Sequence, residues 1–176
     1  MGAPESPPDW TSVEVAIPRA SERLPGISMA GFSHRGPALV DIAMVAHPSV
    51  TLLVDLSDED GLVYDAHGRR ERGSVAVGLI PGDLRISGRT DEAGQCLQIR
   101  LSPVVAAAVL GAPTELVGTV VRLEDVWGRD AGRAEDRLRA ATSWDERFTI
   151  AADALGAVRA RGTMCGMTTN RKVHAA

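Results

Sequence analysis

The feature that most constrains this chain is a change of periodicity between Leu97 and Gly128, where a strand pattern is followed at once by a helix pattern. In the strand part, apolar and polar residues alternate in the order Leu97, Gln98, Ile99, Arg100 and Leu101. Such alternation is typical of a strand with one buried face. Ser102 can then cap a helix, Pro103 suits a first turn, and Gly111 allows a left-handed helix end. The segment therefore predicts a strand joined directly to a helix.

The preceding part of the chain has the pattern of antiparallel β structure. Short apolar runs separated by turn residues occupy residues 27–100. One run, residues 50–56, is followed by an acidic turn with Gly61 and by a second run over residues 62–64, which predicts a hairpin. Residues 65–73 are charged, and we expect a solvated loop there. Further strands are expected at residues 75–79, 84–86 and 97–101.

Helical periodicity follows the strands almost to the end of the chain. Asp130 is a candidate cap for a helix with one apolar and one charged side. Ser143 and Glu146 form an S-x-x-E capping box, in which each side chain accepts a hydrogen bond from a free backbone N–H. This box predicts a helix from Trp144 to about Arg159. Its apolar face consists of Phe148, Ala151, Ala152, Leu155 and Val158.

These patterns predict one α+β domain. An antiparallel, barrel-like sheet over residues 10–101 is followed by helices over residues 103–159, and a length of 176 residues suits a single domain. We expect a flexible N-terminal arm over residues 1–9, the domain itself over residues 10–161, and a disordered tail over residues 162–176.

Charge, cysteine spacing and the distribution of apolar residues argue against a nucleic-acid-binding, secreted or membrane-spanning protein. A formal net charge of -4 offers no general attraction to nucleic acid. The two cysteines are far apart, the N-terminus has no secretory signal pattern, and no run approaches the roughly 20 apolar residues of a membrane-spanning helix. We therefore expect a cytoplasmic protein.

The sequence contains no pattern typical of catalysis. The four histidines are scattered outside any metal-binding motif, and nucleophile-elbow, P-loop and dinucleotide-binding motifs are absent. Asp58, Glu59 and Asp60 suit a solvated turn better than a cation site. Cys96 is expected to be a packed side chain. The sequence thus predicts no enzyme, no metal and no cofactor.

A family resemblance extends from about Gly31 to Val158. Five segments carry it: GFSHRG, HPSVTLLVDL, LQIRLSPVVAAAVLGAP, VVRLEDVWG and RLRAATSWDERF. Together they resemble the N-terminal region of AraC-type transcriptional regulators of the high-GC actinobacterial type. The resemblance implies a cupin-like sheet followed by helices, in a domain that senses an effector or holds a dimer. Such regulators read DNA with two helix-turn-helix units after this region, for which too few residues follow Arg161. We expect the sensor and dimerisation domain of such a regulator, without direct DNA binding of its own. A short piece of a longer protein, a natural stand-alone sensor and a truncated regulator all stay open as the reason.

The concave side of the predicted sheet and the amphipathic segment 144–159 indicate where a small-molecule effector and a second chain would bind. We expect the effector in a pocket inside the β portion. The candidate lining residues are Phe32, His34, His47 and Tyr64. A homodimer is expected to form through the helix that begins at Trp144. The candidate dimerisation residues are Phe148, Ala152 and Leu155.

Two other hypotheses stay open at this point. The first is a free-standing β-barrel protein that binds a small molecule. The second is a small barrel enzyme that holds a metal on dispersed histidines. Stoichiometric metal that is lost on His34→Ala or His47→Ala would favour the enzyme.

Overall fold

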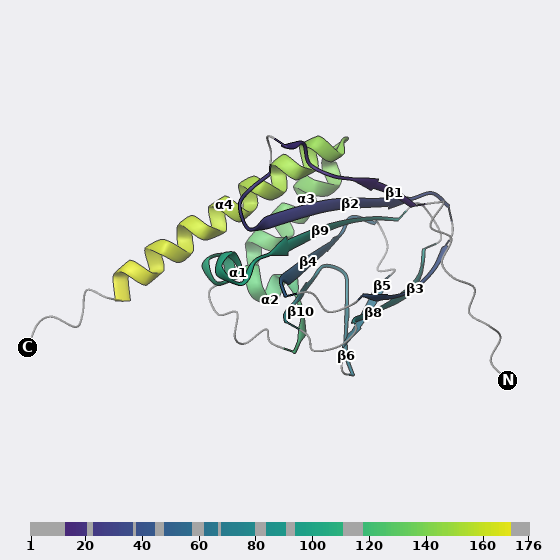
Figure 1. Cartoon of the computed structure of the whole chain (residues 1–176), viewed down its shortest axis with the longest axis horizontal. Coiled ribbons are helices and arrows are strands. Elements are labelled where there is room, and N and C mark those ends of the chain that lie inside the picture. The colour runs from purple at the N-terminus through teal and green to yellow at the C-terminus, as the bar shows by residue number, and fades with distance from the viewer. Residues whose placement is uncertain are drawn as a thin grey trace, which may run out of the picture.

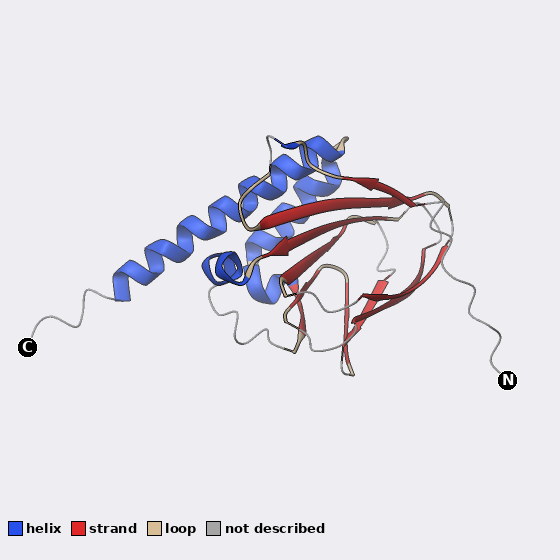
Figure 2. Cartoon of the chain, viewed as in Figure 1, coloured by secondary structure: helices blue, strands red, loops and turns tan. Residues whose placement is uncertain are grey.

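The computed structural model describes residues 13–20, 23–36, 38–44, 48–57, 62–66, 68–79, 84–90, 94–110 and 118–169. Within these ranges two antiparallel sheets face each other, and helices cover the outer side of one sheet (Figures 1 and 2). The α+β class, with an antiparallel β portion followed by helices, is therefore confirmed. The predicted arm over residues 1–9 lies outside the described residues.

The larger sheet contains the strand and helix junction predicted from the sequence. Its strands, in spatial order, are β1 (Val13–Ala16), β2 (Ile27–His34), β9 (Gln95–Leu101), β4 (Val50–Asp55), β7 (Val75–Val77) and β10 (Val120–Arg122). All neighbouring strands run antiparallel. β9 and β4 consequently lie in the middle of this sheet.

The smaller sheet faces the larger one. Its strands, in spatial order, are β3 (Ala38–Met44), β8 (Leu84–Thr90), β5 (Leu62–Ala66) and β6 (Arg69–Arg72). Among the described residues, neither strand order closes on itself and no strand is shared between the sheets. The barrel-like sheet predicted from the sequence is therefore an open sandwich of two sheets.

The two faces of the larger sheet pack against different partners. On the outer face is a cluster that we call the helix-side core, which includes Leu52, Val54, Leu97, Ile99, Leu101, Trp127, Leu138, Phe148 and Leu155. On the inner face is the inter-sheet core, which includes Leu53, Tyr64, Ala66, Val75, Val77, Leu84, Ile86 and Val120. Burial of apolar surface, at about 25 cal/mol per Å², stabilises both clusters. β4 contributes to both, so it is buried on both faces.

The hairpin predicted from residues 50–56 and 62–64 is wrong, because its two strands lie in different sheets. β4 pairs with β9 on one side, where Leu52 lies opposite Ile99, and with β7 on the other. β5 pairs with β6 and β8. Since both edges of β4 are occupied, the next strand joins the facing sheet. The acidic turn predicted at residues 58–61 lies outside the described residues.

The charged loop predicted over residues 65–73 contains a strand instead. β6 pairs with β5 around Gly68, whose φ of 80° is left-handed backbone that glycine adopts without strain. Arg70 lies opposite Asp65 and donates a hydrogen bond to its carboxylate, with Nε and Oδ2 2.8 Å apart. This strand has cross-strand ion pairing in place of apolar alternation, so its sequence pattern predicts a loop.

Helix starts agree with the sequence patterns closely. The helices are α1 (Pro103–Leu110), α2 (Leu123–Trp127), α3 (Arg129–Ala140) and α4 (Trp144–Thr169). The Val105 N–H donates a hydrogen bond to Ser102 Oγ at 3.4 Å, which confirms Ser102 as a cap. Asp130 is not the cap of α3, because it lies inside the first turn. Its negative charge still stabilises the N-terminal end of α3, where free N–H groups carry partial positive charge.

The capping box at the start of α4 is formed with one change of partner. Ser143 Oγ accepts a hydrogen bond from the Glu146 N–H at 3.2 Å, as predicted. The Glu146 carboxylate accepts its bond from the Thr142 N–H at 3.0 Å, one residue earlier than expected. Both bonds satisfy backbone donors that precede the first helical hydrogen bond.

α4 continues well past its predicted end at Arg159. It extends to Thr169, so residues 162–169 of the expected tail are helical, while residues 170–176 lie outside the described residues. The prediction followed the apolar face, whereas an established helix continues with one hydrogen bond for each added residue until a stop signal. In Figure 1 the C-terminal end of α4, drawn in yellow, projects past the sheets.

Arg147 joins α3 to α4. Its Nε donates a hydrogen bond to the Leu138 carbonyl at 3.1 Å, and its Nη2 donates one to the Ala141 carbonyl at 3.2 Å. These carbonyls lie at the C-terminal end of α3, where partial negative charge favours a cation. The guanidinium also lies over the Trp144 ring, 4.8 Å from its centre. Burial lowers the pKa of Arg147 from its ordinary value.

The first turn of α4 packs directly on β2. A Cβ atom at residue 31 would overlap the indole ring of Trp144, so this position requires glycine because of the close approach. Trp144 also stacks on Phe148, with ring centres 5.9 Å apart. The contact of Trp144 with Gly31 therefore sets how closely α4 approaches the sheet.

We expect Gly31→Ala to lower the free energy of unfolding by about 1–3 kcal/mol, because the added methyl group displaces the Trp144 ring. Gly132→Ala in α3 is the matched control, since nothing lies within 4 Å of a Cβ atom built there. Alanine at that helical position should stabilise the protein by up to about 1 kcal/mol. Urea unfolding followed by circular dichroism measures both variants. Equal stability of the two would contradict the packing of Trp144 on Gly31.

Candidate functional site

A cavity of about 290 Å³ lies between the two sheets. β2, β9 and β4 of the larger sheet supply one wall, and β3, β5 and β8 of the smaller sheet supply the other. Figure 1 shows these two groups of strands facing each other. Pockets that bind small ligands typically measure about 300–1,000 Å³. This cavity therefore has the size of a site for a small molecule.

The wall formed by the smaller sheet is apolar except for the Tyr64 hydroxyl. Val40, Ile42 and Met44 are alternate residues of β3, so they share its inner face. Ile86 of β8 lies opposite Ile42 in the register, and Leu62 of β5 lines the cavity as well. Hydrocarbon groups are favoured against such a wall because they leave water when they bind there.

The opposite wall is polar along β9. Cys96, Gln98 and Arg100 alternate with the apolar residues of this strand and line the cavity. Gln98 is only 8% exposed. The Nε atom of Arg100 is buried and makes no hydrogen bond with the described residues. A few convergent polar groups in an apolar pocket are the usual means of orienting a ligand.

Sequence reasoning did not assign Gln98 and Arg100 to the site. The alternation in residues 97–101 predicts one buried face, and these two residues belong to the other. In the structure β9 is a central strand, and the smaller sheet covers its polar face. The local sequence carries no signal for this, because the same alternation occurs whether the polar face meets water or a second sheet.

Three of the four predicted pocket residues line the cavity. Phe32 and His34 lie on β2, and Tyr64 lies on β5. Phe32 is opposite Cys96 in the register of β2 with β9, which places both on the inner face. His47 lies outside the described residues. Ligand binding among these side chains stays a prediction.

The predicted dimerisation residues have a different environment from the one expected. Phe148 and Leu155 are buried in the helix-side core, and Ala152 packs against it. Their apolar surface is used for packing within one chain, so a dimer interface on α4 would have to use other residues. The homodimer itself stays a prediction.

Tyr64 and Cys96 interact across the two sheets. The Tyr64 hydroxyl is buried without a hydrogen bond of good geometry, and the Cys96 thiol beside it is a weak partner. Burial, with a smaller contribution from the negative charge of Asp55, raises the pKa of Cys96 to about 12. Burial raises the pKa of Tyr64 as well. Both groups are therefore protonated at neutral pH, in agreement with a packed Cys96.

We expect iodoacetamide to alkylate Cys96 on the order of 10³-fold more slowly in the folded protein than in the unfolded chain at pH 8. A thiol with a pKa of about 12 is ionised in about one molecule in 10⁴ at that pH, against about one in four for an ordinary thiol. Cys165→Ser isolates the signal of Cys96, and mass spectrometry over time measures the rate. Similar rates in both states would show that the thiol is not protected.

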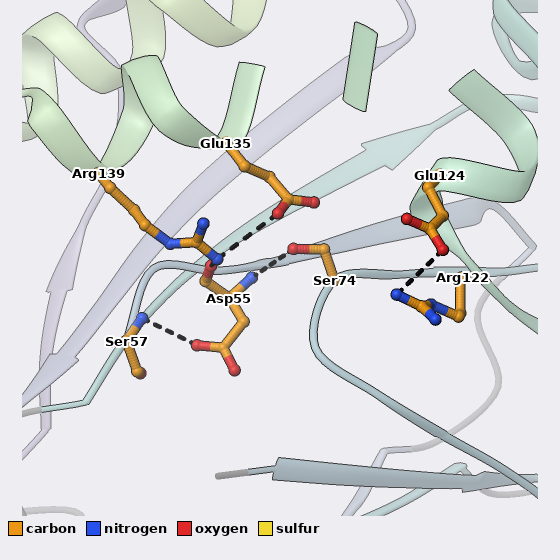
Figure 3. A network of polar contacts seen from close by, with 7 residues as sticks. All are labelled: Asp55, Ser57, Ser74, Arg122, Glu124, Glu135 and Arg139. Carbon is orange, nitrogen blue, oxygen red and sulfur yellow. Dashed lines mark hydrogen bonds and ion pairs between the residues drawn. The ribbon is translucent and has the colours of Figure 1, made fainter. Parts of the chain in front are cut away.

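Polar contacts around Asp55 hold the end of β4 beside the cavity (Figure 3). The Asp55 N–H donates a hydrogen bond to Ser74 Oγ at 3.1 Å, and Oδ1 of Asp55 accepts one from the Ser57 N–H at 2.9 Å. Arg139 of α3 donates a hydrogen bond to the Asp55 carbonyl at 3.1 Å and pairs with Glu135. Ser57 lines the cavity, so these contacts connect the cavity wall to the helices.

The described part of the chain has neither a cluster of metal ligands nor a membrane-spanning helix. It contains no group of three or more His, Cys, Asp or Glu side chains that could hold a metal ion. Of the two histidines named in the metal hypothesis, His34 lines the cavity and His47 lies outside the described residues. Within the same part of the chain, no helix is both long enough and apolar enough to cross a membrane.

No protein-family model matches the sequence, and no curated protein matches it either. Solved structures give distant likenesses. The cupin domain of Cnp3 from Schizosaccharomyces pombe has a TM-score of 0.41 and 11% identity, over 55% of this chain and 69% of that one. A cupin superfamily protein from Desulfitobacterium hafniense DCB-2 has a TM-score of 0.39 and 17% identity, over 56% and 83%. A cupin domain of an XRE family transcriptional regulator from Enterobacter cloacae has a TM-score of 0.39 and 11% identity, over 52% and 98%.

Proposed function

We propose that this chain binds a small molecule in the cavity between its two sheets, as the sensor domain of an AraC-type transcriptional regulator. The observation that carries the binding function is the cavity itself, which combines an apolar wall with a few polar groups on the opposite wall. A well-packed interior has few voids larger than a water molecule. A cavity of about 290 Å³ is therefore unlike the rest of the core.

The regulatory part of the proposal is supported by the sequence resemblance described above. The segments that carry it include the junction of β9 with α1 and the start of α4. The junction of β9 with α1 adjoins the cavity wall that holds Gln98 and Arg100. The start of α4 packs on β2. Only β9 separates a ligand in the cavity from the helices on the other face of the sheet. This short distance favours an effect of the ligand on a partner bound to the helices.

Binding fits the cavity better than catalysis does. Tyr64 and Cys96, its buried titratable groups of nucleophilic type, both have a raised pKa and stay protonated. A protonated thiol is a poor nucleophile, and catalytic cysteines have a lowered pKa instead. These two side chains therefore support binding rather than nucleophilic catalysis as the proposed role of the cavity.

We expect at least one compound in a panel of small acids, alcohols, amines and sugars to raise the Tm of the protein through this cavity. A ligand present at 100 times its Kd stabilises the folded state by about 2.7 kcal/mol. Ile42→Trp, which fills the cavity from β3, should abolish the shift. Ala43→Trp is the matched control, because residue 43 is exposed on the other face of the same strand. Differential scanning fluorimetry measures all three proteins.

The proposal fails if no compound raises the Tm, or if every shift survives in Ile42→Trp. Either result would mean that the cavity does not receive a ligand from this panel of four chemical classes. Retention of the shift in Ala43→Trp together with its loss in Ile42→Trp excludes an unspecific effect of a new tryptophan on β3.

We also propose that the chain forms a homodimer through the C-terminal end of α4. Support comes from the resemblance and from the projection of this end past the sheets (Figure 1). Sedimentation velocity is expected to give twice the chain mass of 18.6 kDa. Arg161→Pro, which breaks the helix inside its projecting end, should give a folded monomer, and Arg161→Ala should remain a dimer. A monomeric parent protein, or a dimer that tolerates Arg161→Pro, would contradict this interface.

A further inference from the structure

The cavity wall carries a positive charge that no carboxylate in the described chain neutralises. Arg100 is placed there by β9, and its Nε atom is buried without a hydrogen bond. Within the described residues no ion pair involves this side chain. A buried N–H group of a guanidinium that has no acceptor loses hydration without compensation, which costs free energy. A ligand atom is the natural acceptor for it.

The surroundings of Arg100 on β9 and its neighbours are neutral. Ser28 of β2 and Thr51 of β4 lie directly opposite it in the two registers, and Gln98 is the next inward-facing residue. No aspartate or glutamate is found among the described residues that line the cavity. Asp55 lies four residues beyond Thr51 on β4, about 13 Å along the strand. Its carboxylate accepts the Ser57 N–H there.

Several other arginines of this chain have a carboxylate partner even at exposed positions. Arg85 donates two hydrogen bonds to Asp41, of 2.8 and 2.6 Å, on the outer face of the smaller sheet. Arg19 pairs with Asp145 at 2.7 Å. Ion pairs exposed to water contribute little to stability, whereas a charge inside a cavity needs a partner more. Arg100, which is partly buried in the cavity wall, lacks such a partner within the described residues.

We propose that the cavity binds a small apolar molecule with a carboxylate group, and that Arg100, assisted by Gln98, holds the carboxylate. The inference rests on the proposed binding function and names the chemical class of the ligand. A guanidinium forms short, charge-assisted and often bidentate hydrogen bonds with a carboxylate. The Gln98 amide can donate a further hydrogen bond from the same face of β9. The hydrocarbon part lies against Val40, Ile42 and Met44 of the facing wall.

The volume limits the ligand to a small acid. A water molecule occupies about 30 Å³ in the liquid, so about 290 Å³ holds on the order of ten non-hydrogen atoms. Octanoate has this size and combines a carboxylate with a purely hydrocarbon chain. 1-Octanol has the same chain with a neutral head, and the pair of compounds therefore isolates the contribution of the charge.

Isothermal titration calorimetry of the full chain with octanoate, 3-phenylpropanoate and their two matched alcohols tests the inference. We expect at least one acid to bind about tenfold or more tightly than its alcohol, because the alcohol cannot form the charge-assisted contact. Arg100→Gln should remove this preference and leave alcohol binding unchanged. Arg100→Lys, which keeps the charge but not the planar fork, should retain part of the preference.

Arg122→Gln is the matched control, since Arg122 lies on β10 outside the cavity and pairs with Glu124 at 3.0 Å (Figure 3). It should leave the binding of both acids unchanged. Without ligand, Arg100→Gln should have a Tm equal to or above that of the parent protein, because it removes an uncompensated charge. A purely structural arginine would instead lower the Tm on replacement.

The possible results separate the two proposals. If acids and alcohols bind equally and Arg100→Gln changes neither, the carboxylate preference is wrong while small-molecule binding stands. If neither acid binds but another compound class shifts the Tm through Ile42, the inference is again wrong and the proposed function stands. If no compound of any class binds, both are wrong. A preference for acids that is lost in Arg100→Gln and kept in Arg122→Gln supports the inference.

Discussion

Leu97, Ile99 and Leu101 of β9 are buried beneath the helices, while Gln98 and Arg100, between them in sequence, face the smaller sheet. A strand has two faces, and a central strand with neighbours on both edges must place each face against a different part of the molecule. The leucine and isoleucine side chains hold the helices on the outer face. The polar side chains alternate with them and therefore point between the sheets, opposite the largely apolar wall of the smaller sheet. The rest of the structure depends on this division.

The outer face is closely packed and held by specific polar contacts. Trp144 packs on Gly31, Arg147 satisfies the carbonyls at the end of α3, and Arg139 connects α3 to the end of β4. The inner face differs, because it encloses a cavity of about 290 Å³. The helix-side core is the larger of the two buried clusters, whereas the inter-sheet core lies beside the cavity. The charge of Arg100, which would destabilise a packed core, lies at this cavity, and the proposed carboxylate ligand would neutralise it.

Local signals predicted the elements that depend on local physics. Ser102 caps α1, and Ser143 caps α4 at the predicted place, because each hydroxyl accepts a bond from an N–H three residues away. Non-local features were predicted less well. The prediction that β4 and β5 form a hairpin was wrong, because two adjacent apolar runs do not indicate which sheet each strand joins. β6 was missed because its pairing with β5 is marked by Arg70 and Asp65, with little apolar content.

The sequence by itself determined the class of the domain, the junction of strand and helix after Leu101, and three aromatic or polar residues that line the cavity. Periodicity and capping decide these features within a few residues of chain. Only the tertiary structure decided that Phe148 and Leu155 serve the core of this chain and that Gln98 and Arg100 face a cavity. The reason is physical. Whether a polar face meets water or a second sheet depends on strands that are distant in sequence, and alternation along one strand is the same in both cases.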